Sequence, residues 1–124
     1  MIVKVKSLYS FFEKLYGLFI STSNIHERYI LKNKEKEFFI YLCIGNSLGY
    51  EIYSNEMIEF ICKEMGIAKS TANVYRSEVR AKNWFQKKDE GGKLANPFSF
   101  DEVPKEINMN ITLINESHAF KVIK

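Results

Sequence analysis

The chain has 124 residues, of which 46% are hydrophobic and 15% aromatic, and its formal net charge is +3. This length and composition predict one globular domain with modest appendages, and they exclude an intrinsically disordered chain. No run of about 18 apolar residues occurs, so a membrane-spanning helix is excluded as well. The N-terminus alternates apolar and basic residues and lacks the features of a signal peptide, so we expect a cytoplasmic protein.

The N-terminal quarter predicts a short strand followed by an amphipathic helix. Residues 2–5 alternate as in a strand. From Ser7 to Ile20, large apolar residues recur at spacings of three and four, which predicts a helix with one apolar face. The simplest interpretation of this face is that it belongs to the core, but it is larger than a three-helix core needs. Residues 1–32 are therefore an extension that either completes the core or dimerises, and we expect a homodimer whose interface includes Phe12 and Phe19. The following residues, 25–31, are compatible with either a short helix or a strand.

Three further helices are expected in the middle of the chain. Asn33 is a suitable N-cap for an almost continuously apolar helix, which is typical of the centre of a fold. Residues 50–53 predict a short strand. Ser54 then caps a short helix that ends at Gly66, and the next helix extends from about 69 to 82.

Two β-hairpins are expected after these helices. Trp84 and Phe85 begin a strand, residues 89–92 form a turn, and residues 93–95 return. Near the end of the chain, residues 107–123 contain two alternating runs that predict a C-terminal β-hairpin. The predicted fold class is therefore mainly α with small β (α+β).

Positive charge is concentrated between residues 69 and 93. This segment contains seven Lys or Arg residues and three acidic residues, a net charge of +4, so the rest of the chain sums to −1. On the helix at 69–82, Ala72, Tyr75 and Val79 share one face and are expected to pack inward. The opposite face presents long hydrogen-bond donors, and such a basic surface favours nucleic-acid binding.

Over residues 33–97, the order of these elements resembles that of the winged helix-turn-helix superfamily. The specific likeness is to the turn of that family and lies in Met65-Gly66-Ile67-Ala68-Lys69-Ser70-Thr71-Ala72. Two positions depart from the family pattern, since Ala68 replaces the usual capping Ser and Asn83 replaces the usual Gly. Asn adopts the left-handed conformation more readily than most residues, so the second departure is tolerable.

The resemblance implies a double-stranded DNA-binding transcriptional regulator of the bacterial or phage type. It implies a winged helix-turn-helix domain at 33–97, with the N-terminal extension at 1–32 and a connector with a β-hairpin at 98–124. Helix 69–82 would lie in the major groove, and a basic wing at 84–95 would touch the neighbouring backbone. Arg76 and Arg80 have donors that suit guanine, and Asn73 has groups that suit adenine. The residues expected to bind DNA are Lys69, Ser70, Thr71, Asn73, Arg76, Ser77, Arg80, Lys87, Lys88 and Lys93.

Two other functions are compatible with the sequence. A protein–protein interaction module of the same fold agrees with the modest net charge. Residues 93–97 resemble the wing return and Asn-Pro of plasmid replication initiators, which makes a phage or plasmid replication initiator the third alternative. Besides DNA, the expected partners are a second copy of the chain and the transcription or replication machinery. The abundance of Asn, Lys and Ile, with only two prolines, favours a phage or other mobile element.

We expect no catalytic centre, cofactor or metal site. No nucleophile is paired with a base, and no Gly-rich phosphate loop follows a strand. The potential metal ligands are isolated from one another in the sequence; they are Cys43, Cys62, His26 and His118.

Overall fold

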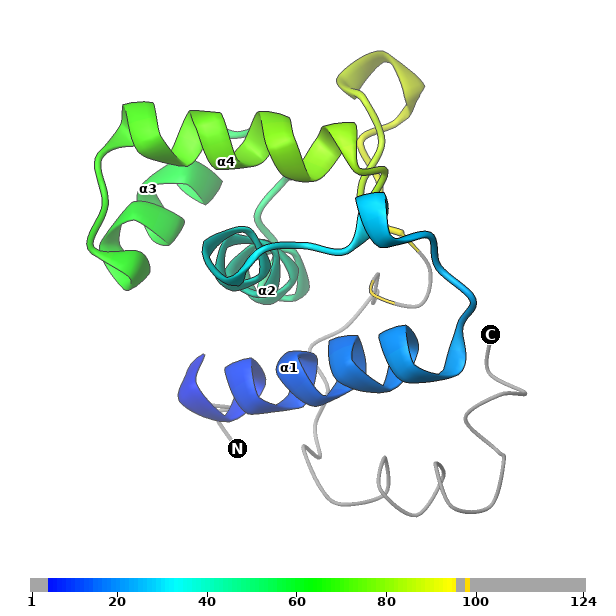
Figure 1. Cartoon of the computed structure of the whole chain (residues 1–124). Coiled ribbons are helices and arrows are strands. Elements are labelled where there is room, and N and C mark those ends of the chain that lie inside the picture. The colour runs from blue at the N-terminus through cyan, green and yellow to red at the C-terminus, as the bar shows by residue number, and fades with distance from the viewer. Residues whose placement is uncertain (1–4, 96–97, 99–124) are drawn as a thin grey trace.

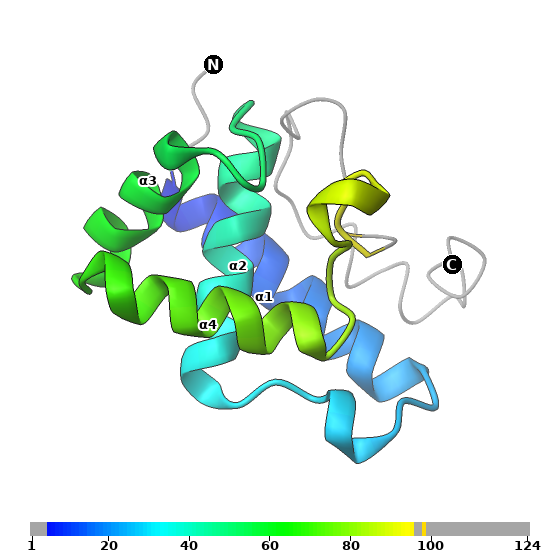
Figure 2. The ribbon, with the colours of Figure 1, turned by 90° about the horizontal axis from the view of Figure 1, so that it is seen from above.

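The computed structural model describes residues 5–95 and residue 98, and within them it contains four α-helices and two 3₁₀ turns. The helices are α1 (Val5–Thr22), α2 (Asn33–Ser47), α3 (Asn55–Met65) and α4 (Lys69–Ala81), and the 3₁₀ turns are η1 (Glu27–Tyr29) and η2 (Lys88–Glu90). α2 lies at the centre, with α1 packed on one side and α3 and α4 on the other (Figure 1). Seen from above, α4 crosses α2 (Figure 2). None of these helices is long and apolar enough to cross a membrane.

α2 is central because both layers bury its side chains. The residues of this helix that are fully shielded from solvent are Phe38, Phe39, Ile40, Leu42 and Ile44. Near its C-terminus, a Cβ atom added to Gly45 would collide with the thioether of Met57 on α3. A glycine at this position therefore allows α2 and α3 to approach closely. The predicted central position of the apolar helix is confirmed.

α1 belongs to the same hydrophobic core as the other helices. Leu8, Phe12, Leu15 and Tyr16 are buried, and Phe12 has no exposed surface. Phe19 is half-buried and lies with its ring centroid 5.7 Å from that of Trp84. The expectation that Phe12 forms a dimer interface is therefore wrong, because α1 uses this side chain to complete the core of its own chain. Homodimerisation itself stays a prediction.

The helix boundaries at α3 and α4 follow the predicted signals. The Ser54 hydroxyl accepts a hydrogen bond from the Met57 amide at 3.1 Å, so Ser54 is the N-cap of α3. Gly66 ends the helix in the left-handed conformation, at φ 68°. Asn83, two residues beyond the end of α4, also takes a positive φ, of 69°, the conformation that an Asn was expected to tolerate there. At α2 the prediction was off by one residue, because Lys32 rather than Asn33 is the N-cap.

The predicted β-wing at 84–95 is wrong, since the described residues contain no strand. Phe85 and Leu94 form an isolated antiparallel bridge, flanked by hydrogen bonds from Gln86 N to Lys93 O and from Ala95 N to Trp84 O, both 2.9 Å long. Pairing stops there because the next groups have other partners. The Gln86 carbonyl accepts from the Tyr53 hydroxyl at 2.7 Å, and the Lys93 amide donates to Gln86 Oε1 at 3.2 Å.

The fold class is accordingly all-α in the part of the chain that the structure describes, and neither the α+β class nor a winged helix-turn-helix holds. Residues 50–53 are not a strand either, because the Ser54 amide closes a turn onto Glu51 O at 3.1 Å. The ambiguous segment at 25–31 contains η1. Val5 begins α1, and the rest of the predicted strand at 2–5 lies outside the described residues, as does the predicted C-terminal hairpin.

Candidate nucleic-acid interface

α3 and α4 are joined by a tight turn that leaves the start of α4 accessible. The amides of Gly66 and Ile67 both donate to Cys62 O, at 2.8 and 3.1 Å, and three residues separate the two helices. Ala68 precedes α4 in an extended conformation and provides no side-chain cap. No acidic residue occurs in α4 before Glu78. The first turn of α4 therefore offers backbone N–H groups and the positive end of the helix dipole without a competing carboxylate on the helix.

One side of α4 is buried and the other faces solvent. Ala72 and Val79 are fully buried, and Tyr75 packs with its ring centroid 6.3 Å from that of Phe38. The inward face predicted from the sequence is confirmed. The exposed residues of the helix are Lys69, Ser70, Asn73, Val74, Ser77, Glu78 and Ala81. Thr71, Arg76 and Arg80 are half-buried and lie at the edges of this exposed side.

Arg76 is held against other parts of the protein instead of extending freely into solvent. Its Nη2 donates to Asn73 Oδ1 at 3.0 Å, and its Cζ lies 5.5 Å from the centroid of the Tyr53 ring. Because the Tyr53 hydroxyl also bonds the Gln86 carbonyl, Tyr53 links α4 to the segment that follows it. The sequence alone predicts a short strand at Tyr53 and does not indicate this role.

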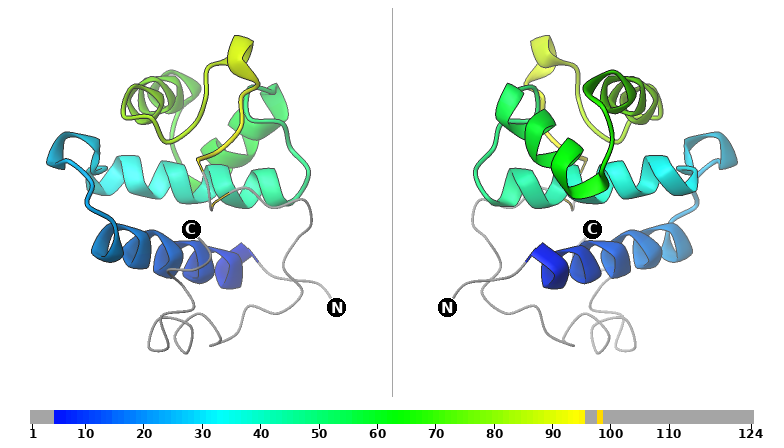
Figure 3. Two further views of the ribbon diagram at one scale, coloured as in Figure 1. Left: turned by 90° about the vertical axis from the view of Figure 1, so that its right-hand side faces the viewer. Right: turned by 90° about the vertical axis from the view of Figure 1, so that its left-hand side faces the viewer.

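Residues 86–93, here called the basic loop, stand beside α4. Lys87, Lys88 and Lys93 are all exposed, as are the acidic residues Asp89 and Glu90. Figure 3 shows α4 and η2, which lies within this loop, on the same side of α2, opposite α1. The structure therefore brings the predicted lysines of the loop and the predicted residues of the helix onto one side of the molecule.

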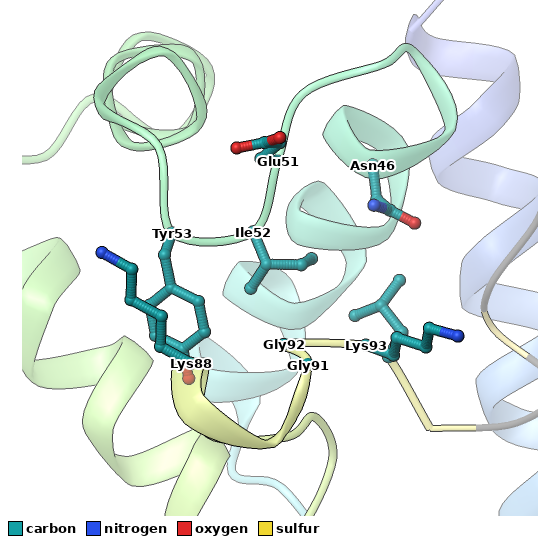
Figure 4. Close-up of a pocket in the computed structure, with 9 residues that line it drawn as sticks. Asn46, Glu51, Ile52, Tyr53, Lys88, Gly91, Gly92 and Lys93 are labelled. Atoms are coloured by element: carbon teal, nitrogen blue, oxygen red, sulfur yellow. The ribbon is translucent and has the colours of Figure 1, made fainter.

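A pocket of about 340 Å³ separates the basic loop from the segment that precedes α3. Its wall combines Asn46, Glu51 and Tyr53 with Lys88 and Lys93 of the loop. Figure 4 shows the two lysine amino groups pointing away from each other, towards opposite ends of the pocket. Because the two amino groups diverge, the pocket does not form a single anion-binding site. It places positive charge along an edge of the molecule instead.

The cation at the start of α4 has only an exposed carboxylate partner. Lys69 Nζ lies 3.9 Å from Glu59 Oε2, and the two side chains are 62% and 65% exposed. An ion pair this exposed contributes little to stability, so Lys69 is able to exchange Glu59 for another anion.

Lys82 at the end of α4 has a structural role. Its Nζ lies 2.6 Å from Oε1 of Glu35, whose side chain is only 4% exposed. Burial alone would raise the pKa of Glu35, but hydrogen bonds from Lys82 and from the Lys32 amide lower it to about 2. The nearby carboxyl group of Glu35 raises the pKa of Glu78. Lys82 therefore fixes the end of α4 to the start of α2 and is not available to a ligand.

Val74 was missed by the sequence reasoning although it is 54% exposed. A rotation of about 100° per residue places position 74 well away from the buried line of Ala72 and Val79. The helical period alone therefore predicts that this side chain is exposed.

No cluster of three or more potential metal ligands occurs among the residues that the structure describes. No protein-family model matches the chain, and neither the curated proteins nor the solved structures searched contain a significant match.

Proposed function

We propose that the protein binds double-stranded DNA, with the exposed side of α4 in the major groove and the basic loop against the phosphate backbone. The observation behind this proposal is that the exposed side of α4 and the basic loop lie on the same side of the molecule. Residues 69–77 of α4 contain no acidic residue and present hydrogen-bonding side chains to solvent, on the same side of the molecule as the basic loop. An α-helix fits the major groove, whose width is about 12 Å.

Within this proposal the residues divide by their exposure. Ser70, Asn73 and Ser77 lie at the middle of the exposed side and would face base edges. Arg76 is held towards Tyr53, so it would contact DNA at the edge of the groove, between the helix and the basic loop. The phosphate contacts would come from Lys69, Lys87, Lys88 and Lys93.

The role that such binding would serve is regulation of transcription. A regulator protects a site in a promoter, commonly its own, whereas a replication initiator protects an origin. Footprinting the protein on both regions tests this assignment. Protection confined to an origin would replace regulation with initiation and would leave DNA binding intact.

If the basic loop contacts phosphates, changing Lys87 and Lys88 together to alanine should weaken binding to all duplexes alike. Each phosphate contact contributes about 0.9 to the slope of log affinity against log salt, so the slope should become shallower by roughly two. Fluorescence anisotropy on a labelled duplex at several salt concentrations measures this slope.

The matched control changes Lys6 and Lys14 to alanine. It removes the same charge from α1, on the opposite side of α2. A slope that changes equally in both variants would show that the loop acts only through net charge, which contradicts contact with the backbone.

A further inference from the structure

Val74 is the most exposed large hydrophobic residue in the described part of the chain. It lies in the middle of α4, on the side that faces away from α2. Valine is a poorer helix former than alanine because its branched side chain loses rotamer freedom. With half of its surface in solvent, this side chain contributes little to the core. Neither helix propensity nor core packing therefore favours valine over alanine at this position.

The neighbours of Val74 on the helix surface are short. Positions three and four residues away are adjacent on a helix, and three of those four positions hold Ser70, Thr71 and Ser77. The fourth position holds Glu78, which is exposed. Three of the four neighbours of Val74 are thus small hydroxyl side chains, and over these a flat surface is able to approach its two methyl groups closely.

We propose that Val74 packs against the C5-methyl group of a thymine and thereby selects a T·A pair in the bound DNA. This inference rests on the proposed binding of α4 in the major groove. In that groove, the thymine methyl group is the apolar feature that distinguishes one base pair from the others. Val74 would recognise this methyl group by excluding water from it and from its own methyl groups.

The test begins with duplexes selected from a randomised library by the wild-type protein. Each thymine of the preferred duplex is then replaced by deoxyuridine, which removes only the C5-methyl group and keeps base pairing. At one thymine, the wild-type protein should lose about fourfold in affinity, the effect expected for one buried methyl group. Val74→Ala should bind the thymine and deoxyuridine duplexes equally, and it should remain folded because alanine favours helix.

Leu48→Ala is the matched control, since Leu48 is also exposed but lies at the end of α2. This variant should keep the sensitivity to deoxyuridine. The inference is overturned, with DNA binding intact, if the selection enriches no sequence, if no thymine is sensitive, or if Val74→Ala remains sensitive. Failure to bind any duplex would overturn the proposed function together with the inference.

Discussion

Replacing Trp84 by alanine should destabilise the folded protein by roughly 3–5 kcal/mol, the range typical of a large aromatic removed from a core. Trp84 is 3% exposed, and four other rings surround it, with centroid distances of 5.1 to 5.8 Å. These rings belong to Tyr16, Phe19, Phe39 and Phe98. Its indole N–H also donates to Tyr29 O at 2.6 Å, which attaches the segment around η1 to the core.

Urea unfolding followed by circular dichroism measures this loss, because Trp84 is the only tryptophan and its removal abolishes the fluorescence probe. Trp84→Phe retains an aromatic ring but leaves Tyr29 O without its donor, so its cost should be clearly smaller than that of alanine. Equal stability of the alanine variant and the wild type would contradict the central position of Trp84.

Replacing Lys82 by methionine should cost about 3 kcal/mol of stability at neutral pH. The change keeps the aliphatic stem but leaves the buried carboxylate of Glu35 without its cation, and breaking a buried pair in this way typically costs about 3–5 kcal/mol. The double variant Glu35→Gln with Lys82→Met removes both charges and should recover most of the loss. If both variants unfold at the same urea concentration as the wild type, the pair does not contribute to stability.

The same pair should make stability depend on pH in acid. The pKa of Glu35 is about 2 in the folded protein and 4.5 ordinarily, so its ionised form stabilises the fold above pH 4.5. This contribution, roughly 3 kcal/mol for such a shift, should be lost as the pH falls from 4.5 towards 2. Urea midpoints across this range should fall steeply for the wild type and for Glu78→Gln, but only weakly for Lys82→Met. A steep fall in Lys82→Met would assign the acid sensitivity to other carboxyl groups.

The helices were predictable from the sequence because their signals are local. Ser54 and Gly66 set the two ends of α3 through contacts within a few residues. The spacing of Ala72 and Val79 determines which side of α4 is buried. The position of Phe12 was not predictable in this way. Periodicity shows that it lies on an apolar face but not whether the same chain or a second copy covers that face.

The wing was predicted incorrectly because its ladder depends on residues distant in the sequence. Alternation and the glycines at 91 and 92 are typical of a hairpin. In the structure, the Tyr53 hydroxyl, 33 residues away in the sequence, donates a hydrogen bond to the Gln86 carbonyl. The tip of the loop is formed by η2. No local sequence pattern predicts a distant donor that competes with the strand backbone for this carbonyl.

The candidate interface was predictable in its charge but not in its geometry. The sequence placed lysines and hydrogen-bonding residues on one helix and one loop, and the structure brings both onto one side of the molecule. The sequence did not show that Arg76 packs on Tyr53 or that Lys82 pairs with Glu35. These contacts join residues that are 23 and 47 positions apart in the chain.

The most direct test of DNA binding through α4 compares two variants with the same change of charge. Ser70→Glu combined with Ser77→Glu adds two negative charges to the exposed side of α4, and Lys6→Glu makes an equal change on α1. Affinity for a random-sequence duplex is measured by fluorescence anisotropy at about 0.1 M salt, where charges more than roughly 10 Å apart are largely screened. If α4 enters the groove, the double variant should bind at least about tenfold more weakly than the wild type, and Lys6→Glu should differ little from it. Equal affinities of the two variants, or no binding by the wild-type protein, would contradict DNA binding through α4.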